Sequence, residues 1–173
     1  MYKIINFKAM QKDLDTVISI NKGLGMPYQN KDINHQIRVA CWVELGELAN
    51  EIEFFKYWKG NKRNDREKQL NEFADVMHFL LSLMNINDIK TYDVLDLMDI
   101  HIAYKCAKKL YPSSFTLTKL FDGLMKSIMK EEYDQALIKL CHVMYVLDFE
   151  PLELQLAYDG KHTINLKRQR ENY

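Results

Sequence analysis

The sequence predicts an all-α fold, a bundle of about six or seven helices. Apolar residues recur at intervals of three and four along most of the chain, which is the period of an amphipathic helix and not of a strand. Only 6 glycines and 3 prolines occur among the 173 residues, so breaks between helical stretches are few. This length suits one core, and we expect residues 1–173 to form a single domain.

The first three helices follow from these breaks. Residues 7–21 form the first, which should stop at the glycines and proline of residues 23–27. The second begins near Asp32, and its continuous apolar stripe should carry it to residues 55–58. After a polar loop comes the third, about residues 65–85, which is apolar nearly all round. Such a helix belongs in the middle of a bundle.

The rest of the chain continues the helical period. Four more helices are expected, at about residues 91–110, 117–130, 132–147 and from 151 to near the end. Pro112 and Pro151 mark two of the junctions, and Pro151 suits the first position of a helix.

The composition excludes several classes of protein. The 24 basic and 24 acidic residues balance, so no overall positive field attracts nucleic acid or an anionic membrane. Polar residues interrupt every apolar run, and the amino terminus lacks a secretory pattern, so we expect a cytoplasmic protein. Cys41, Cys106 and Cys141 lie far apart in apolar helical patterns. We expect all three to pack in the core, with no disulfide or zinc site.

Two pairs of acidic residues are the candidate functional residues. Glu44 and Glu47 are three residues apart on the second expected helix, and Glu51, either an additional ligand or a solvated residue, lies four further along. Glu72 and Asp75 repeat the spacing on the third helix. Apolar residues flank both pairs, so their charges would lose hydration and repel each other. The cost is on the order of several kcal/mol unless a cation compensates.

A metal site would remove this cost. If the two helices pack face to face, Glu44, Glu47, Glu72 and Asp75 converge, and carboxylate oxygens suit Mg²⁺ or Mn²⁺ far better than zinc. The natural ligand of such a site is a phosphate chain bound through the metal. The alternative, a solvated helix face, requires lysines between the acids, and residues 32–55 contain none.

The acidic pairs and three other segments resemble the motifs of a known family. The two acidic pairs, with 24 residues between them, resemble the metal motif of the all-α nucleoside triphosphate pyrophosphohydrolases, which include dimeric dUTPases, MazG-like enzymes and dCTP pyrophosphatases. Gln11, Leu14 and Asp15 resemble the first motif of the dimeric dUTPases, and residues 43–51 followed by residues 55–59 resemble the phage and Gram-positive branch of that family. The spacing of the family's closing motif is matched by Tyr158, Lys161, Asn165, Arg168, Gln169 and Tyr173.

The resemblance spans almost the whole chain and implies an enzyme. Its activity would be that of a dUTP diphosphatase, which hydrolyses dUTP to dUMP and pyrophosphate, with cleavage of dUDP left open. The implied metal ligands are the four acids, with Mg²⁺ as cofactor and with Glu44 or Glu47 holding the attacking water. A homodimer is also implied, and a regulatory protein partner is conceivable as an addition. Three positions depart from the family pattern: Asp15 and His162 each replace Asn, and Asn172 replaces Gly.

The substrate-binding residues expected on these grounds are Gln11, Asp15, Lys56, Trp58, Lys59, His78, Tyr158, Lys161, Asn165, Arg168 and Gln169. Gln11 offers a donor and an acceptor to the edge of uracil. The aromatic at Trp58 could stack a base between two lysines, although such a residue more often serves packing. Lys161, Asn165 and Arg168 form one polar helix stripe that suits phosphate, or else merely complements a helix end.

Three alternatives remain open. A ferritin-like di-iron bundle needs two Glu-x-x-His units, whereas this chain has only the related pair Asp75 and His78. A binding module without catalysis would have no reason to keep four convergent buried acids. Within the enzymes, a MazG-like or dCTP-type hydrolase would share the metal site and differ in its base pocket.

Overall fold

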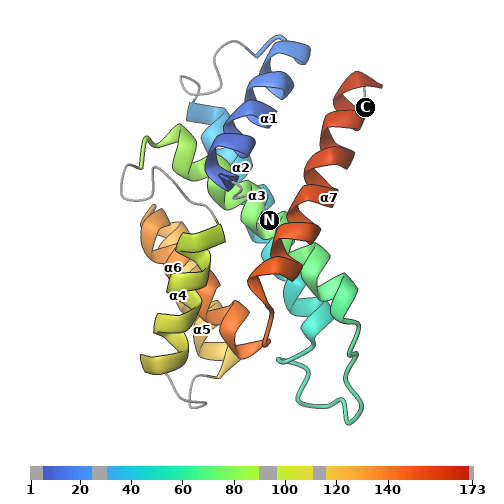
Figure 1. Cartoon of the computed structure of the whole chain (residues 1–173), viewed down its shortest axis with the longest axis vertical. Helices are drawn as coiled ribbons and strands as arrows, with labels where there is room; N and C mark the ends of the chain where they lie inside the picture. The colour runs from blue at the N-terminus through green and yellow to red at the C-terminus, as the bar shows by residue number, and fades with distance from the viewer. Residues whose placement is uncertain (1–5, 25–30, 90–96, 111–115, 172–173) are drawn as a thin grey trace.

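The computed structural model describes residues 6–24, 31–89, 97–110 and 116–171. These residues form seven helices (Figure 1): α1 (Phe7–Asn21), α2 (Lys31–Ile52), α3 (Arg66–Ile86), α4 (Leu97–Leu110), α5 (Leu117–Met129), α6 (Tyr133–Val146) and α7 (Pro151–Arg170). The expected all-α fold is confirmed. Several expected features lie outside the described residues: the helix stop at 25–27, the start of a helix near residue 91, the junction at Pro112 and the chain end at 172–173.

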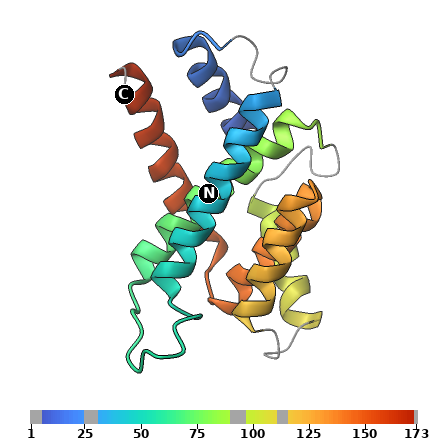
Figure 2. The ribbon, with the colours of Figure 1, turned by 180° about the vertical axis from the view of Figure 1, so that it is seen from behind.

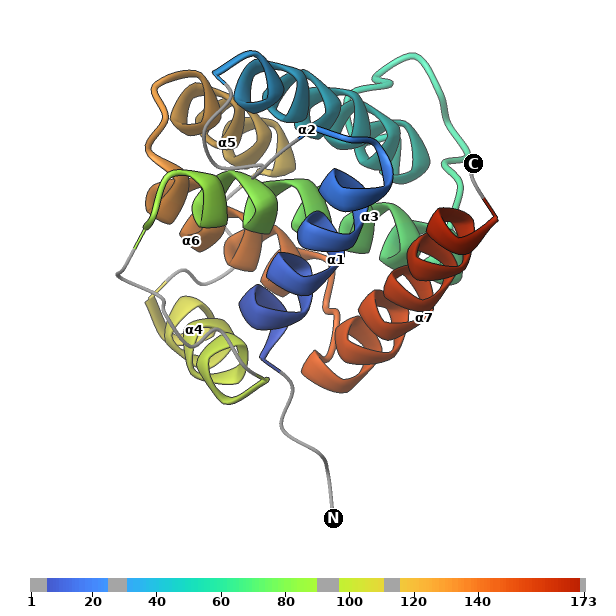
Figure 3. The same cartoon turned by 90° about the horizontal axis from the view of Figure 1, so that it is seen from above.

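Helix α3 is the centre of the molecule. It packs against α1, α2, α6 and α7, and the view from above shows it running between α2 on one side and α1 with α7 on the other (Figure 3). Its buried side chains include Phe73, Met77, Leu80, Leu81 and Met84. Burying each such side chain contributes about 1.5–3 kcal/mol. The expectation that this helix, apolar nearly all round, lies in the middle of the bundle is therefore confirmed.

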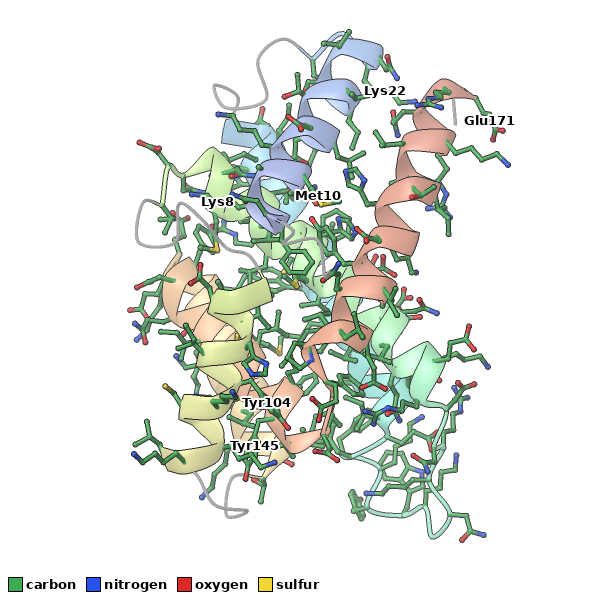
Figure 4. The ribbon with its side chains drawn as sticks, in the orientation of Figure 1. Lys8, Met10, Lys22, Tyr104, Tyr145 and Glu171 are labelled. Atoms are coloured by element: carbon green, nitrogen blue, oxygen red, sulfur yellow. The ribbon has the colours of Figure 1, made fainter. Side chains whose placement is uncertain are left out.

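The other helices form two groups around α3. Helices α5 and α6 pack as a hairpin beside α2, as the view from behind shows (Figure 2). Helix α4 packs on α6, where the rings of Tyr104 and Tyr145 meet edge to face with centroids 6.1 Å apart (Figure 4). None of the described helices is long and apolar enough to cross a membrane.

Helices α1 and α7 flank α3 and run in the same direction, so that Lys22 and Glu171 mark neighbouring ends (Figure 4). Several polar contacts join these helices. Asn21 Nδ2 donates to the carbonyl of Gln169 at 2.9 Å, and the His162 ring lies 3.2 Å from the carbonyl of Met10. Three of the four helices that build the site described below, α1, α3 and α7, are thus fixed to one another directly.

The second helix ends earlier than the sequence indicated. It stops at Ile52, and Glu53 adopts a left-handed conformation with φ of 58°. The Glu53 carboxylate is only 1% exposed and accepts hydrogen bonds from Lys59 Nζ at 2.7 Å, Arg63 N at 2.8 Å and Lys56 Nζ at 3.0 Å. These donors, Lys59 first, lower the pKa of Glu53 to about 2. The prediction of a helix through residues 55–58 was wrong because these bonds from the following loop fold the chain back.

The cysteine prediction was correct for two of three residues. Cys41 and Cys141 are buried, but Cys106 is exposed. Helix α4 buries Ile100, Tyr104 and Ala107, and Cys106 lies on a different face of the same helix. Its apolar surroundings in the sequence therefore did not indicate burial.

Candidate functional site

The packing of α2 against α3 brings the acidic residues together. One oxygen each of Glu44, Glu72 and Asp75 can be chosen so that all three lie within 4.8 Å of one another. Glu47, one turn further along α2, lines the same cavity. The spacing of three residues on each helix places both members of a pair on one face, and the two faces meet. The expected convergence of the two pairs is present in the structure.

Burial and mutual repulsion both disfavour ionisation of these carboxylates. The pKa of Glu44 is raised from its usual 4.5 to about 7, first by burial and then by the nearby charges of Asp75, Glu47 and Glu72. Burial is also the first cause of the raised pKa values of Glu72 and Asp75. A cluster of hard oxygen ligands that resists carrying its own negative charge fits a divalent cation.

Helix α7 supplies positive charge to this cluster. Lys161 forms an ion pair with Asp75 through Oδ2. Asn165, Arg168 and Gln169 follow on the same helix and line the same cavity. The Arg168 charge also lowers the pKa of Asp75. The cavity therefore has an acidic wall from α2 and α3 and a cationic wall from α7.

The cavity has a volume of about 450 Å³, within the range of small-molecule sites. Its remaining wall is apolar and comes from α1, α2 and α3. The side chains of that wall include Leu14, Ile18, Ile33, Ile37, Phe79 and Ile86. Phe79 was not among the expected site residues. Its spacing was a usable signal, since it lies four residues after Asp75 and seven after Glu72 on one helix face.

Gln11, Asp15, His78 and Ser82 of the cavity wall form one polar group with Tyr158, which is buried beside them and does not line the cavity. Gln11 Nε2 donates to Asp15 Oδ1 at 2.8 Å and to Ser82 Oγ at 2.9 Å. The Tyr158 hydroxyl donates to Gln11 Oε1 at 3.0 Å, and its ring stacks on His78 with centroids 3.9 Å apart. The structure thus brings four expected residues together, and Ser82 joins them without having been indicated by the sequence.

Four expected or ambiguous residues lie outside the cavity. Lys56 and Lys59 are bound to Glu53, and Trp58 is 66% exposed with its ring edge against Tyr57. Glu51 pairs with Arg63 at 2.6 Å and is not among the cavity residues. The early end of α2 moves this segment away from the acidic cluster. Within one chain, these side chains do not reach the site.

A family model described as dUTPase matches residues 3–173 of the chain. No curated protein matches it.

The metal-free protein should be less stable at high pH. The pKa of Glu44 is higher in the folded protein than in the unfolded chain, so protonation of Glu44 stabilises the fold. This contribution is present below about pH 4.5 and is lost as the pH rises through about 7. Mg²⁺ should reverse the loss, since at about 100 times its Kd a cation stabilises by about 2.7 kcal/mol. In a chain of this size that corresponds to about 5–10 °C in Tm.

Thermal unfolding at pH 6 and pH 8, with and without Mg²⁺, measures this effect. Glu44→Gln should raise the Tm of the metal-free protein at pH 8 and remove most of the gain on adding Mg²⁺. The exposed Glu67→Gln serves as a control and should behave as wild type. A full Mg²⁺ gain in Glu44→Gln would place the cation elsewhere.

Proposed function

Since the chain belongs to the dUTPase family, whose model covers it almost from end to end, we propose that the acidic cluster of α2 and α3 is the centre at which dUTP is cleaved. The protein is a dUTP diphosphatase, a hydrolase of nucleotide metabolism that converts dUTP to dUMP and pyrophosphate. Members of this family use a divalent metal, and the substrate is a nucleotide. The observation that supports the location is the convergence of Glu44, Glu72 and Asp75 within 4.8 Å.

Glu44, Glu47, Glu72 and Asp75 are the proposed ligands, and Mg²⁺ is the proposed cofactor, with Mn²⁺ as a substitute. Four carboxylates without Cys or paired His suit these ions. When bound, the metal would supply positive charge to the phosphate chain and acidify a water molecule. Glu44 or Glu47 would orient that water and accept its proton at a carboxylate oxygen.

The cationic wall of α7 would bind the outer phosphates. Lys161 and Arg168 carry the charge, and Asn165 Oδ1 accepts from Arg168 Nη1 at 3.4 Å, a contact that helps to orient the guanidinium. These groups would stabilise the charge that develops on the departing pyrophosphate. The base would lie against the apolar wall, where Phe79 offers a ring for stacking. dUDP would fit the same cavity, since it lacks only the terminal phosphate.

Purified protein with Mg²⁺ should be given dUTP, dCTP, dTTP and UTP in separate reactions. Release of pyrophosphate and nucleoside monophosphate is expected to be fastest from dUTP. Asp75→Asn should lower kcat by at least about 100-fold, because it removes a ligand charge from the cluster. The exposed Asp122→Asn on α5 is the matched control and should retain activity.

Two results would contradict this proposal. Preference for dCTP would favour the dCTP-type alternative, and release of orthophosphate without pyrophosphate would mean terminal-phosphate hydrolysis. Full activity in Asp75→Asn would place the reaction away from the acidic cluster.

We also propose a homodimer formed through the outer face of α2. Val39, Val43, Gly46 and Asn50 recur at four, three and four residues and are all exposed. Gly46 faces open space, and a glycine inside a helix costs about 0.5–1 kcal/mol relative to alanine. Close approach of a second helix at this position would account for a glycine here. The resemblance to the dimeric dUTPases favours a second copy of this chain as that partner.

Sedimentation velocity tests the dimer. Wild type should sediment at twice the chain mass of 20.6 kDa, and Val43→Arg should sediment as a monomer. Ile102→Arg, at an exposed position on α4, is the control and should remain dimeric. A monomeric wild type at concentrations where the enzyme is active would exclude the dimer.

A further inference from the structure

Lys161 of α7 is a cation in direct contact with the acidic cluster. Its ammonium pairs with Asp75 Oδ2, and the two side chains are only 26% and 19% exposed. Glu44, Glu47 and Glu72 have no ion pair with any residue that the structure describes. The ammonium therefore has the position of a counter-ion for several carboxylates that repel one another.

The charge of Lys161 acts beyond its direct partner. Burial raises the pKa values of Glu44, Glu72 and Asp75, and the Lys161 charge opposes this effect by lowering all three. A positive charge that favours the ionised form of three carboxylates acts on them as a bound metal ion would. Lys161 and a divalent cation therefore compete for the same negative charge.

The Lys161 ammonium can leave the cluster without a movement of its helix. The next residue, His162, contacts the carbonyl of Met10 and so holds this turn of α7 on α1. A lysine carries its charge on a flexible four-carbon chain, so the ammonium can swing while the backbone stays in place. Asn165 and Arg168 follow on the same helix and line the cavity, so a released ammonium stays beside them.

We propose that Lys161 is the resident counter-ion of the metal-free cluster, that it gives up Asp75 when a divalent cation binds, and that it then becomes available to a phosphate oxygen. The inference rests on the proposed metal site, and it adds an order to the binding events: the metal first, the nucleotide second. Only ion-pair, hydrogen-bond and metal–ligand contacts are exchanged. Lys161 thus stabilises the empty site and weakens its affinity for metal.

Titration of the full chain with Mn²⁺ alone, followed by the electron paramagnetic resonance signal of free Mn²⁺, measures this competition. Lys161→Met keeps the length of the side chain and removes its charge. It should tighten Mn²⁺ binding by about 5- to 20-fold, because the ion no longer displaces an ammonium. Lys167→Met on the same helix is the matched control. Lys167 is 73% exposed and pairs with Glu171, so this variant should bind Mn²⁺ as wild type does.

Thermal unfolding of the metal-free protein separates a counter-ion from other roles. At pH 8, Lys161→Met should lower the Tm by about 2–4 °C, because the carboxylates lose their counter-ion. Its affinity for Mn²⁺ should rise at the same time. A residue that only supports the fold would show no such rise, and a residue that only binds phosphate would change neither quantity. Unchanged or weaker Mn²⁺ binding in Lys161→Met would overturn the proposal.

Pyrophosphate binding in the presence of EDTA tests the release of Lys161. Asp75→Asn and Glu47→Gln each remove one negative charge from the cavity wall, but of these two acids only Asp75 pairs with Lys161. Asp75→Asn should therefore bind pyrophosphate about 3- to 10-fold more tightly than Glu47→Gln. The difference should disappear when both changes are made in Lys161→Met. Equal affinities in the chain that retains Lys161 would overturn the order of binding.

These outcomes are distinct from failure of the proposed function, because metal binding and unfolding are measured without turnover. If wild type cleaves dUTP but Lys161→Met binds Mn²⁺ no more tightly, the function stands and the counter-ion role is refuted. If wild type cleaves no dUTP but Lys161→Met tightens Mn²⁺ binding, the counter-ion role stands and the function is refuted.

Discussion

The central constraint on the structure is that two packed helices must hold negatively charged side chains close to one another. Helices α2 and α3 bring Glu44, Glu72 and Asp75 within 4.8 Å in a partly buried setting, and the raised pKa of each shows how unfavourable their ionisation is. Only a rigid frame can maintain this arrangement. Helix α3 provides it, because its apolar surface is enclosed on several sides by other helices and cannot rotate without exposing its core residues.

The same frame divides the cavity by chemistry. The acidic wall is met by Lys161 of α7, which pairs with Asp75, while the apolar wall, which includes Phe79, comes from α1, α2 and α3. A triphosphate has its charge at one end and its base at the other, so this division matches the shape of dUTP.

The sequence was sufficient for features that depend on local periodicity. Glu44 with Glu47, and Glu72 with Asp75, could be assigned to helix faces by counting, and the apolar character of α3 indicated its central place. Contacts that depend on the path of a loop or on distant segments could not be found in this way. Glu53 accepts hydrogen bonds from Lys56, Lys59 and the backbone of Arg63, and these groups meet only because of the geometry of the loop after α2. Ser82 likewise joins Gln11 across 71 residues, so no spacing rule could indicate it.

The central claim is that the acidic cluster holds the catalytic metal, and anomalous diffraction from crystals grown with Mn²⁺ tests it most directly. The account predicts the strongest manganese peaks among the carboxylates of Glu44, Glu47, Glu72 and Asp75, with the Lys161 ammonium displaced from Asp75. Peaks confined to other carboxylates, such as that of Glu51, in crystals that hydrolyse dUTP would contradict it.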